Sequence, residues 1–154
     1  MKYLKIDNCD LNNGVGARVT LWVSGCDLYC KGCHNSIAWD FNKGIEYTES
    51  TKNTIIELLK NKYITGLSIL GGEPLHPRNR EYIYDLCNTI KEKFSNKDIW
   101  IWTGYNITSF DILPNSDYII DGKFNIDKPT KKKWRGSDNQ RFFKIKDGNL
   151  KLID

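Results

Sequence analysis

Three cysteines are crowded into the segment Ser24–Ser36, SGCDLYCKGCHNS, where residue type and spacing point to metal chemistry. The pattern is Cys26-x3-Cys30-x2-Cys33, and soft thiolate ligands select zinc, copper(I) or iron–sulfur clusters. A structural zinc site needs four ligands, which usually come as two separated pairs. On a cluster of four irons, three cysteines would leave one iron open, and an open position is typical of a catalytic metal site.

Other side chains keep a zinc site open as an alternative. Cys9 or His76 could supply a fourth ligand, whereas His34 directly follows Cys33 and is poorly placed to share one small ion with it. The chain has five cysteines, an odd number that does not suit a disulfide framework. In a reducing compartment, a tight cysteine cluster favours metal binding.

A second candidate site, Gly71-Gly72-Glu73, follows the apolar run Ile64–Leu70. Two glycines let the backbone approach a ligand closely, and a carboxylate can accept charge-assisted hydrogen bonds from an ammonium group. Taken alone, these residues would also describe an ordinary turn with a surface glutamate. Their place at the end of a predicted strand, downstream of the cysteines, favours the ligand-binding interpretation.

Alternating strand and helix patterns must position these residues. Strands are predicted from β-branched and aromatic content over residues 18–25, 64–70, 98–104 and 117–121. Residues 48–62 and 78–94 carry apolar side chains at helical spacing and are predicted as helices. This order predicts an α/β fold with a parallel sheet, followed by a C-terminal β-hairpin around Asp147-Gly148.

In open α/β sheets, ligands bind beyond the carboxyl ends of the strands. The cysteine loop follows the first predicted strand and Glu73 follows the second. Thr103 and Tyr105 follow the third strand, and Asp121 ends the fourth. The unusual chemistry is therefore predicted on one rim. Asn12-Asn13, which precedes the first predicted strand, is interpreted as a turn.

The cysteine loop after a strand resembles the signature of the radical S-adenosylmethionine enzymes. The resemblance implies that Cys26, Cys30 and Cys33 hold a [4Fe-4S] cluster whose fourth iron binds the amine and carboxylate of S-adenosyl-L-methionine. It further implies that the reduced cluster cleaves this cofactor to a 5′-deoxyadenosyl radical, which abstracts a hydrogen atom.

The glycine-rich segment resembles the Gly-Gly-Glu motif of the same family, which binds the cofactor. The resemblance implies no catalytic side chain beyond the cluster and the cofactor. The implied cofactor-binding residues are Gly71, Gly72, Glu73, Thr103, Tyr105 and Asp121.

Longer stretches resemble the family that activates anaerobic ribonucleoside-triphosphate reductase, namely GARVTLWVSGC, CKGCHN, LGGEPL, IWIWTGY, IIDGKF and WRGSDNQR. The resemblance implies that the chain generates a glycyl radical on the large subunit of this reductase, with electrons from a reductant such as flavodoxin. It also implies one domain over residues 1–154, folded as an incomplete, open (β/α) barrel. Gly32 agrees with this narrower family, since many radical S-adenosylmethionine enzymes have an aromatic residue before the third cysteine.

The basic segment Lys128–Arg135 leaves several functions open. Basic residues with an interleaved aromatic, here Trp134, can grip nucleic acid. A solvated loop and a docking site for the reductase are the other interpretations, and the resemblance favours docking without nucleic acid. The rival functions are an activase of another glycyl-radical enzyme and a non-catalytic zinc-binding nucleic-acid module.

Bulk properties agree with a protein of the cytoplasm. No apolar run reaches the ~20 residues that a membrane helix needs, and the N-terminus lacks a signal-peptide core. The formal net charge of +4 is too small to indicate nucleic-acid binding by itself. Cys87 lies on the apolar stripe of a predicted helix and is expected in the core, and Cys9 is also interpreted as structural.

Overall fold

The computed structural model describes residues 1–108, 111 and 113–154. Two helices are present in these ranges, α1 (Glu49–Leu59) and α2 (Arg80–Lys93), and a 3₁₀ helix spans Ser36–Trp39. The strands are β1 (Lys2–Asp10), β2 (Ala17–Val23), β3 (Ile45–Glu46), β4 (Ile64–Gly71), β5 (Asp98–Trp102), β6 (Tyr118–Asp121), β7 (Arg141–Lys146) and β8 (Asn149–Leu152).

All strands belong to one sheet in the order β3-β1-β2-β4-β5-β6-β7-β8. The four central strands are parallel, and the strands on either side of them pair in antiparallel fashion. The register aligns Leu21, Ile69, Ile101 and Ile119 across the parallel strands, and all four side chains are fully buried. This row of β-branched and leucine side chains explains why the parallel strands are nearly continuous apolar runs.

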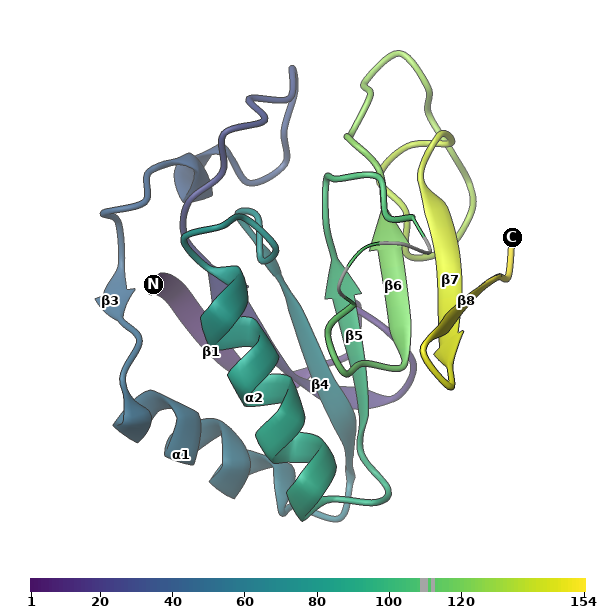
Figure 1. Ribbon diagram of the computed structural model, residues 1–154. Helices are drawn as coiled ribbons and strands as arrows, with labels where there is room; N and C mark the ends of the chain where they lie inside the picture. The colour runs from purple at the N-terminus through teal and green to yellow at the C-terminus, as the bar shows by residue number, and fades with distance from the viewer. Residues whose placement is uncertain (109–110, 112) are drawn as a thin grey trace.

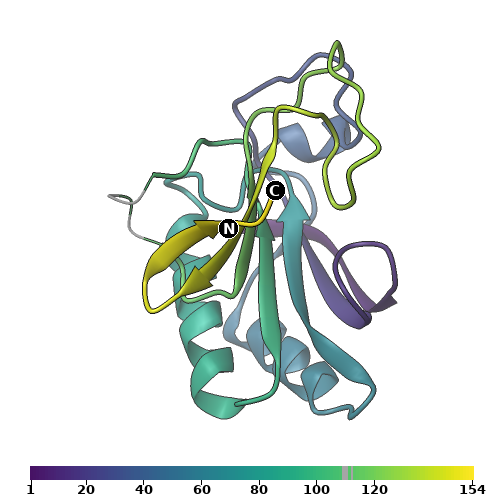
Figure 2. The same ribbon diagram turned by 90° about the vertical axis from the view of Figure 1, so that its right-hand side faces the viewer.

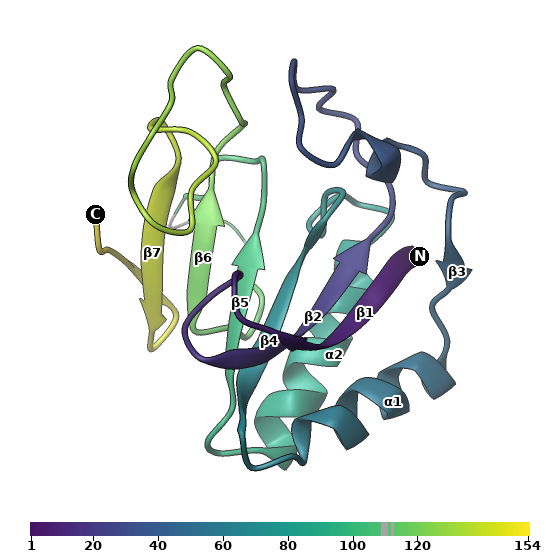
Figure 3. The ribbon, with the colours of Figure 1, turned by 180° about the vertical axis from the view of Figure 1, so that it is seen from behind.

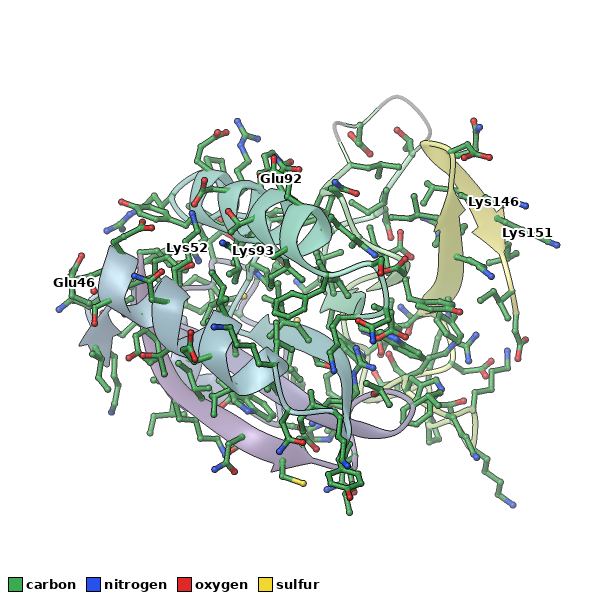
Figure 4. All side chains as sticks on the ribbon, turned by 90° about the horizontal axis from the view of Figure 1, so that it is seen from below. Glu46, Lys52, Glu92, Lys93, Lys146 and Lys151 are labelled. Atoms are coloured by element: carbon green, nitrogen blue, oxygen red, sulfur yellow. The ribbon has the colours of Figure 1, made fainter. Side chains whose placement is uncertain are left out.

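Both helices cover one face of the sheet (Figures 1 and 4). Helix α1 begins with a capping box in which Thr48 and Thr51 satisfy each other's backbone N–H groups. On α2 the residues Ile83, Leu86, Cys87 and Ile90 are fully buried, and they form the core with Ile99 and the other apolar residues of that sheet face. The predicted core position of Cys87 is therefore confirmed.

The other face of the sheet is crossed by the connection between β1 and β2, drawn in purple in Figure 3. Residues on this face are aromatic and polar. Trp100 stacks against Trp102 with ring centroids 5.9 Å apart, while Tyr118 and Phe142 pack against Trp100 at 4.6 and 5.2 Å. Strand β5 is thus buried on both faces, as its alternating Trp and Ile residues predict.

The predicted strands, helices and C-terminal hairpin are present with small shifts of their ends. The hairpin turn places both Asp147 (φ 51°) and Gly148 (φ 74°) in the left-handed region, which is the geometry that suits a two-residue β-turn of this kind. Two strands were not predicted, because β1 and β3 are mostly partly or fully exposed and lack a clean apolar alternation. The strand that was predicted as the first along the chain is therefore β2. In the sheet it lies third, after β3 and β1.

The fold is mixed α/β and is dominated by its open sheet. Only the crossovers β2–β4 and β4–β5 contain an α-helix among the described residues. The described residues include no helix long and apolar enough to cross a membrane. The carboxyl ends of β2, β4, β5 and β6 lie together at the upper end of the molecule in Figures 1 and 2, where long loops rise above the sheet.

Candidate functional site

A cavity of about 490 Å³, here called the central cavity, lies at the carboxyl ends of the parallel strands. This volume lies in the range of roughly 300–1,000 Å³ that is usual for small-molecule sites. Its wall includes Cys26, Cys30 and Cys33, so the fold brings all three predicted ligands to one space. The cysteine loop and the loop formed by residues 122–140 both rise above this end of the sheet (Figure 2).

Glycines shape the cysteine loop. Gly25 (φ 96°) and Gly32 (φ 71°) have left-handed backbone angles that other residues adopt rarely. A Cβ at Gly25 would lie 2.1 Å from the ring of Phe41, so this position also lacks room for a side chain. The Cys33 amide donates to the carbonyl of Cys30 at 3.1 Å, and the Cys33 Sγ accepts a hydrogen bond from Asn35 at 3.4 Å.

The three thiols are sheltered from water. Cys26 and Cys30 are buried, and Cys33 is half-buried. Burial raises the pKa of the Cys26 thiol to about 11, and it also raises the pKa of Cys30. Metal ligands must be deprotonated thiolates, so binding of a metal group would release these protons.

The donor set has the chemistry of an iron–sulfur cluster. Among the described residues, no group of three His, Cys, Asp or Glu side chains converges closely enough to hold one metal ion. Thiolates on a multi-iron cluster bind different irons and therefore do not need to converge on one point. Three soft sulfur donors around one cavity agree with an iron–sulfur cluster in chemistry and in arrangement.

Glu73 lies at the end of β4 and also lines the central cavity. It is 1% exposed. Its Oε1 accepts hydrogen bonds from Thr103 Oγ1 at 2.6 Å and from the Leu75 amide at 2.9 Å, and its Oε2 accepts one from the Gly104 amide at 2.7 Å. Burial nevertheless raises the pKa of Glu73 to about 7, and no cation among the described residues offsets the burial. The carboxylate is thus rigidly held but lacks a countercharge.

Close backbone packing also explains why glycines precede Glu73. The Gly72 and Glu73 amides donate to the carbonyls of Val23 and Gly25 at 2.8 and 2.7 Å. A Cβ at Gly72 would lie 2.5 Å from the Gly25 carbonyl oxygen. The glycine-rich segment therefore packs directly on the base of the cysteine loop, and this close approach links the two predicted motifs.

Of the other predicted cofactor residues, one lines the central cavity and two lie outside its wall. Thr103 lines the central cavity, whereas Tyr105 lies outside its wall and its hydroxyl reaches Asp27 Oδ1 at 3.5 Å. Asp121 is fully buried, pairs with Arg141 at 2.6 Å and accepts a hydrogen bond from the Ile107 amide. Its neighbour Gly122 lines the cavity instead.

One part of the cavity wall, here called the floor, was not predicted from the sequence. Asn12 and Asn13, interpreted as a turn, belong to the cavity wall. Asp10 fixes this turn by accepting hydrogen bonds from the Asn12 amide, the Asn13 side chain and Thr20, at 2.7 to 2.8 Å. The Asp-x-Asn-Asn pattern signals a turn, but nothing local places the turn against the sheet face.

The loop of residues 122–140 forms one side of the cavity through Phe124, Trp134 and Gln140, among others. The Trp102 indole donates to the Trp134 carbonyl at 2.7 Å, which attaches this loop to β5. Gln140 donates to the Gly122 carbonyl at 2.8 Å and closes the base of the loop. The aromatic and amide residues of the loop thus help to enclose the space near the cysteines.

Comparison with known proteins agrees with this geometry. A family model described as a 4Fe-4S single cluster domain matches residues 12–143. The anaerobic ribonucleoside-triphosphate reductase-activating protein of Enterobacteria phage T4 is 46% identical over 151 residues, covering 96% of this chain and 97% of the relative. Proteins of the same name from Pasteurella multocida (strain Pm70) and Escherichia coli (strain K12) are 39% identical and cover 94% and 91% of this chain, and 98% and 96% of the relatives.

The chain belongs to the anaerobic ribonucleoside-triphosphate reductase-activating protein family. The segment that matches the 4Fe-4S family model contains Cys26, Cys30 and Cys33 but not Cys9. An iron–sulfur cluster is therefore the resident cofactor that the family indicates, and it takes precedence over the zinc alternative.

The structure also places three residues that were considered as metal ligands or as residues near the cluster, namely Cys9, His76 and His34. Cys9, which was interpreted as structural, is exposed on β1 and does not belong to the core. His76, which was considered as a fourth ligand of a zinc site, has a side chain that is only 14% exposed and lies 3.4 Å from Asp27. His34 is exposed and packs its ring 4.9 Å from Phe124 at the cavity wall.

The basic segment Lys128–Arg135 is not one uniform surface. Lys131 and Lys133 are exposed, and they have no carboxylate partner among the described residues. Lys132 instead faces Asp138 at 3.5 Å. The Arg135 side chain is 2% exposed and packs over Phe142, so it supports the cavity wall and offers no surface charge.

Proposed function

We propose that this chain activates an anaerobic ribonucleoside-triphosphate reductase by generating a glycyl radical on it, with S-adenosyl-L-methionine as the co-substrate. The observation that carries the proposal is the single cavity that joins three cysteines to Glu73. Relatives that match over nearly the whole chain are named for this activation, which supports the same partner.

Each part of the cavity has a role in the proposal. Cys26, Cys30 and Cys33 would hold a [4Fe-4S] cluster and leave room for the co-substrate. When bound and reduced, such a cluster would supply one electron for the cleavage of S-adenosyl-L-methionine to methionine and a 5′-deoxyadenosyl radical, which would take a hydrogen atom from the target glycine and become 5′-deoxyadenosine. The aromatic residues of the wall, Trp102 and Phe124, exclude water from this reaction.

Glu73 binds the amino group of S-adenosyl-L-methionine in this proposal. Its carboxylate is already oriented by Thr103 and Gly104 and lacks a cationic partner, so a bound ammonium group would supply the missing charge. Gly71 and Gly72 complete the same wall through their backbone. Tyr105, through Asp27, and Asp121, through Gly122, are proposed to position the cofactor site.

The fold supports a macromolecular substrate. We interpret residues 1–154 as one domain in which the parallel strands β2, β4, β5 and β6 form part of an open (β/α) barrel. An open sheet leaves room for a glycine-containing segment of a large protein to reach the central cavity. Lys131 and Lys133, exposed on the neighbouring loop, are proposed to dock the reductase.

The direct test combines the anaerobically reduced protein, S-adenosyl-L-methionine and its reductase. We expect a glycyl-radical doublet in the electron paramagnetic resonance spectrum, together with 5′-deoxyadenosine. Charge reversal at Lys131 and Lys133 should slow radical formation more than uncoupled cofactor cleavage. No radical with an intact cluster and confirmed cofactor cleavage would reject the reductase as the partner.

The cofactor site is tested by equilibrium binding. Glu73→Ala should weaken S-adenosyl-L-methionine binding by about ten- to a hundredfold, because a lost hydrogen bond to a charged group costs about 1.5–3 kcal/mol. The iron content should stay unchanged, since Glu73 is not assigned to the metal. Unchanged affinity would remove Glu73 from the cofactor site.

A further inference from the structure

A second hollow, of about 470 Å³, lies on the outer side of the cysteine loop and is here called the outer groove. Phe124 lines both this groove and the central cavity, so one wall separates the two spaces. The groove residues used below are Tyr29, Lys31, Lys123, Phe124, Ile126 and Asp127.

The outer groove lies next to Cys30, one of the three proposed cluster ligands. Tyr29 and Lys31 flank Cys30 in the chain, and Cys30 and Phe124 both line the central cavity. Lys123 precedes Phe124 in the chain and lines the outer groove. Residues next to Cys30 thus line the outer groove, while Cys30 itself lines the central cavity.

Exposed apolar side chains form the centre of the groove. Tyr29 is 63% exposed and Ile126 is 48% exposed. Tyr29 has a left-handed backbone angle (φ 46°), which is costly for a non-glycine residue, and its ring is held by an edge contact with Trp39 at 5.1 Å. A Cβ at Gly32 would lie 2.3 Å from Ile126 Cδ1, so the glycine before the third cysteine makes room for Ile126.

Positive charge surrounds this apolar centre. Lys31 and Lys123 are exposed, and neither ammonium group has a carboxylate partner among the residues that the structure describes. Asp127 is the acidic residue of the groove lining. The opposite side of the cysteine loop differs, because Asp27 follows Cys26 there and faces His76 at 3.4 Å. The Cys30 side of the cysteine loop therefore suits a partner with an acidic surface better than the Cys26 side does.

We propose that the outer groove is the docking site of the electron donor, a reduced one-electron carrier protein with acidic residues around its redox group. The inference rests on the proposed function, which assigns the central cavity to the co-substrate and the target glycine and so leaves the electron to enter through the other wall. One electron leaves the carrier, which is oxidised, and one electron reduces the cluster. No bond is formed or broken and no proton moves in this step.

The experiment compares two charge-reversed double variants of the cluster-loaded protein. The test variant carries Lys31→Glu and Lys123→Glu. The control carries Lys93→Glu and Lys146→Glu, two exposed lysines that are labelled on the underside of the molecule in Figure 4, at the far end from the cysteine loop. Two such changes remove four charge units, so the formal net charge falls from +4 to 0 in both variants.

The measured quantities are the rate of cluster reduction by reduced flavodoxin and the affinity for oxidised flavodoxin, both without co-substrate or reductase. At about 10 mM ionic strength we expect at least a tenfold slower reduction and weaker binding for the test variant, and near wild-type values for the control. Reduction by photoreduced 5-deazariboflavin, a small neutral reductant, should proceed equally in all three proteins. Added salt should shrink the difference between wild type and test variant.

Three results would overturn the proposal. The first is wild-type reduction by flavodoxin in the test variant, and the second is equal slowing in the control. The third is equal slowing with the small reductant, which would show damage to the cluster. Because neither the co-substrate nor the reductase takes part, a negative result here is distinct from a failure to form the glycyl radical.

Discussion

Two buried charges lie at opposite ends of neighbouring strands, and they are satisfied in different ways. Arg18, at the amino end of β2, is fully buried, pairs with Asp98 at 2.7 Å and donates to Ser68 at 2.7 Å. Glu73, beyond the carboxyl end of β4, is almost as deeply buried but accepts hydrogen bonds from neutral groups alone. Arg18 therefore has a partner of opposite charge within the protein, whereas Glu73 has none among the described residues.

This difference distinguishes the part of the sheet that stabilises the fold from the part that is proposed to bind the cofactor. At the amino end, Arg18 also donates to the Val15 carbonyl at 3.1 Å and so fixes the connection that forms the cavity floor. At the carboxyl end, the raised pKa of Glu73 reflects a buried carboxylate without a countercharge. Buried charges left in this condition are typical of ligand sites.

The largest effect is expected from the cysteines at the carboxyl end. Replacing Cys26, Cys30 or Cys33 by Ala should abolish retention of iron after anaerobic reconstitution, where the wild type should hold about four irons per chain. Iron and sulfide analysis measures this. Cys87→Ala is the matched control, because Cys87 is fully buried in the core away from the cavity and should keep the iron. Iron loss in that control alone would reverse the ligand assignment.

The next largest effect is expected at the amino end. Arg18→Met should lower the free energy of unfolding by about 3 kcal/mol, because removal of one partner of a buried ion pair leaves the other uncompensated. The loss should fall at the low end of the usual range, since the Asp98 side chain is 35% exposed and stays partly hydrated. Urea unfolding measures the change, and adding Asp98→Asn should recover part of it. A decrease in the free energy of unfolding below about 1 kcal/mol would show that the Arg18–Asp98 pair does not stabilise the fold in this way.

Glu73 should make the stability of the metal-free protein depend on pH. Because its pKa is raised to about 7 in the folded state, the native chain holds this proton more tightly than the unfolded chain, in which Glu ionises near its ordinary value. Stability should therefore be full at low pH and fall by about 3 kcal/mol as the pH rises towards 7. Urea unfolding across this range is the measurement. Glu73→Gln should flatten the decline, and an unaltered slope would assign it to other groups.

The smallest effect is expected where the amino-end network meets the cavity floor. Ser68 accepts from Arg18 and donates to the Asn13 carbonyl at 2.5 Å. Ser68→Ala should cost about 1 kcal/mol, since Arg18 keeps Asp98 as a partner, and should speed amide hydrogen exchange in residues 12–16. Ser50→Ala on the exposed side of α1 is the control. Unchanged exchange in the loop would mean that Ser68 does not hold the floor.

The sequence predicted what depends on local pattern. The x3-x2 spacing of the cysteines and the glycine pair before Glu73 are readable without a structure, because short loops and close backbone approach restrict residue type. The apolar faces of α1 and α2 follow from helical periodicity in the same way. The half-exposed strand β1 was missed because it has no continuous buried face.

The sequence alone therefore determined the α/β class, and it predicted the two motifs and the type of donor atom that each would offer to a ligand. Only the tertiary structure decided that Glu73 is held by Thr103 and Gly104, about thirty positions away, and that Asn13 forms the cavity floor. It also decided that the side chain of Arg135, which is part of a basic run, is buried. The physical reason is that burial and hydrogen-bond partners depend on which strands become neighbours in the sheet, and that pairing is set by the packing of the whole core.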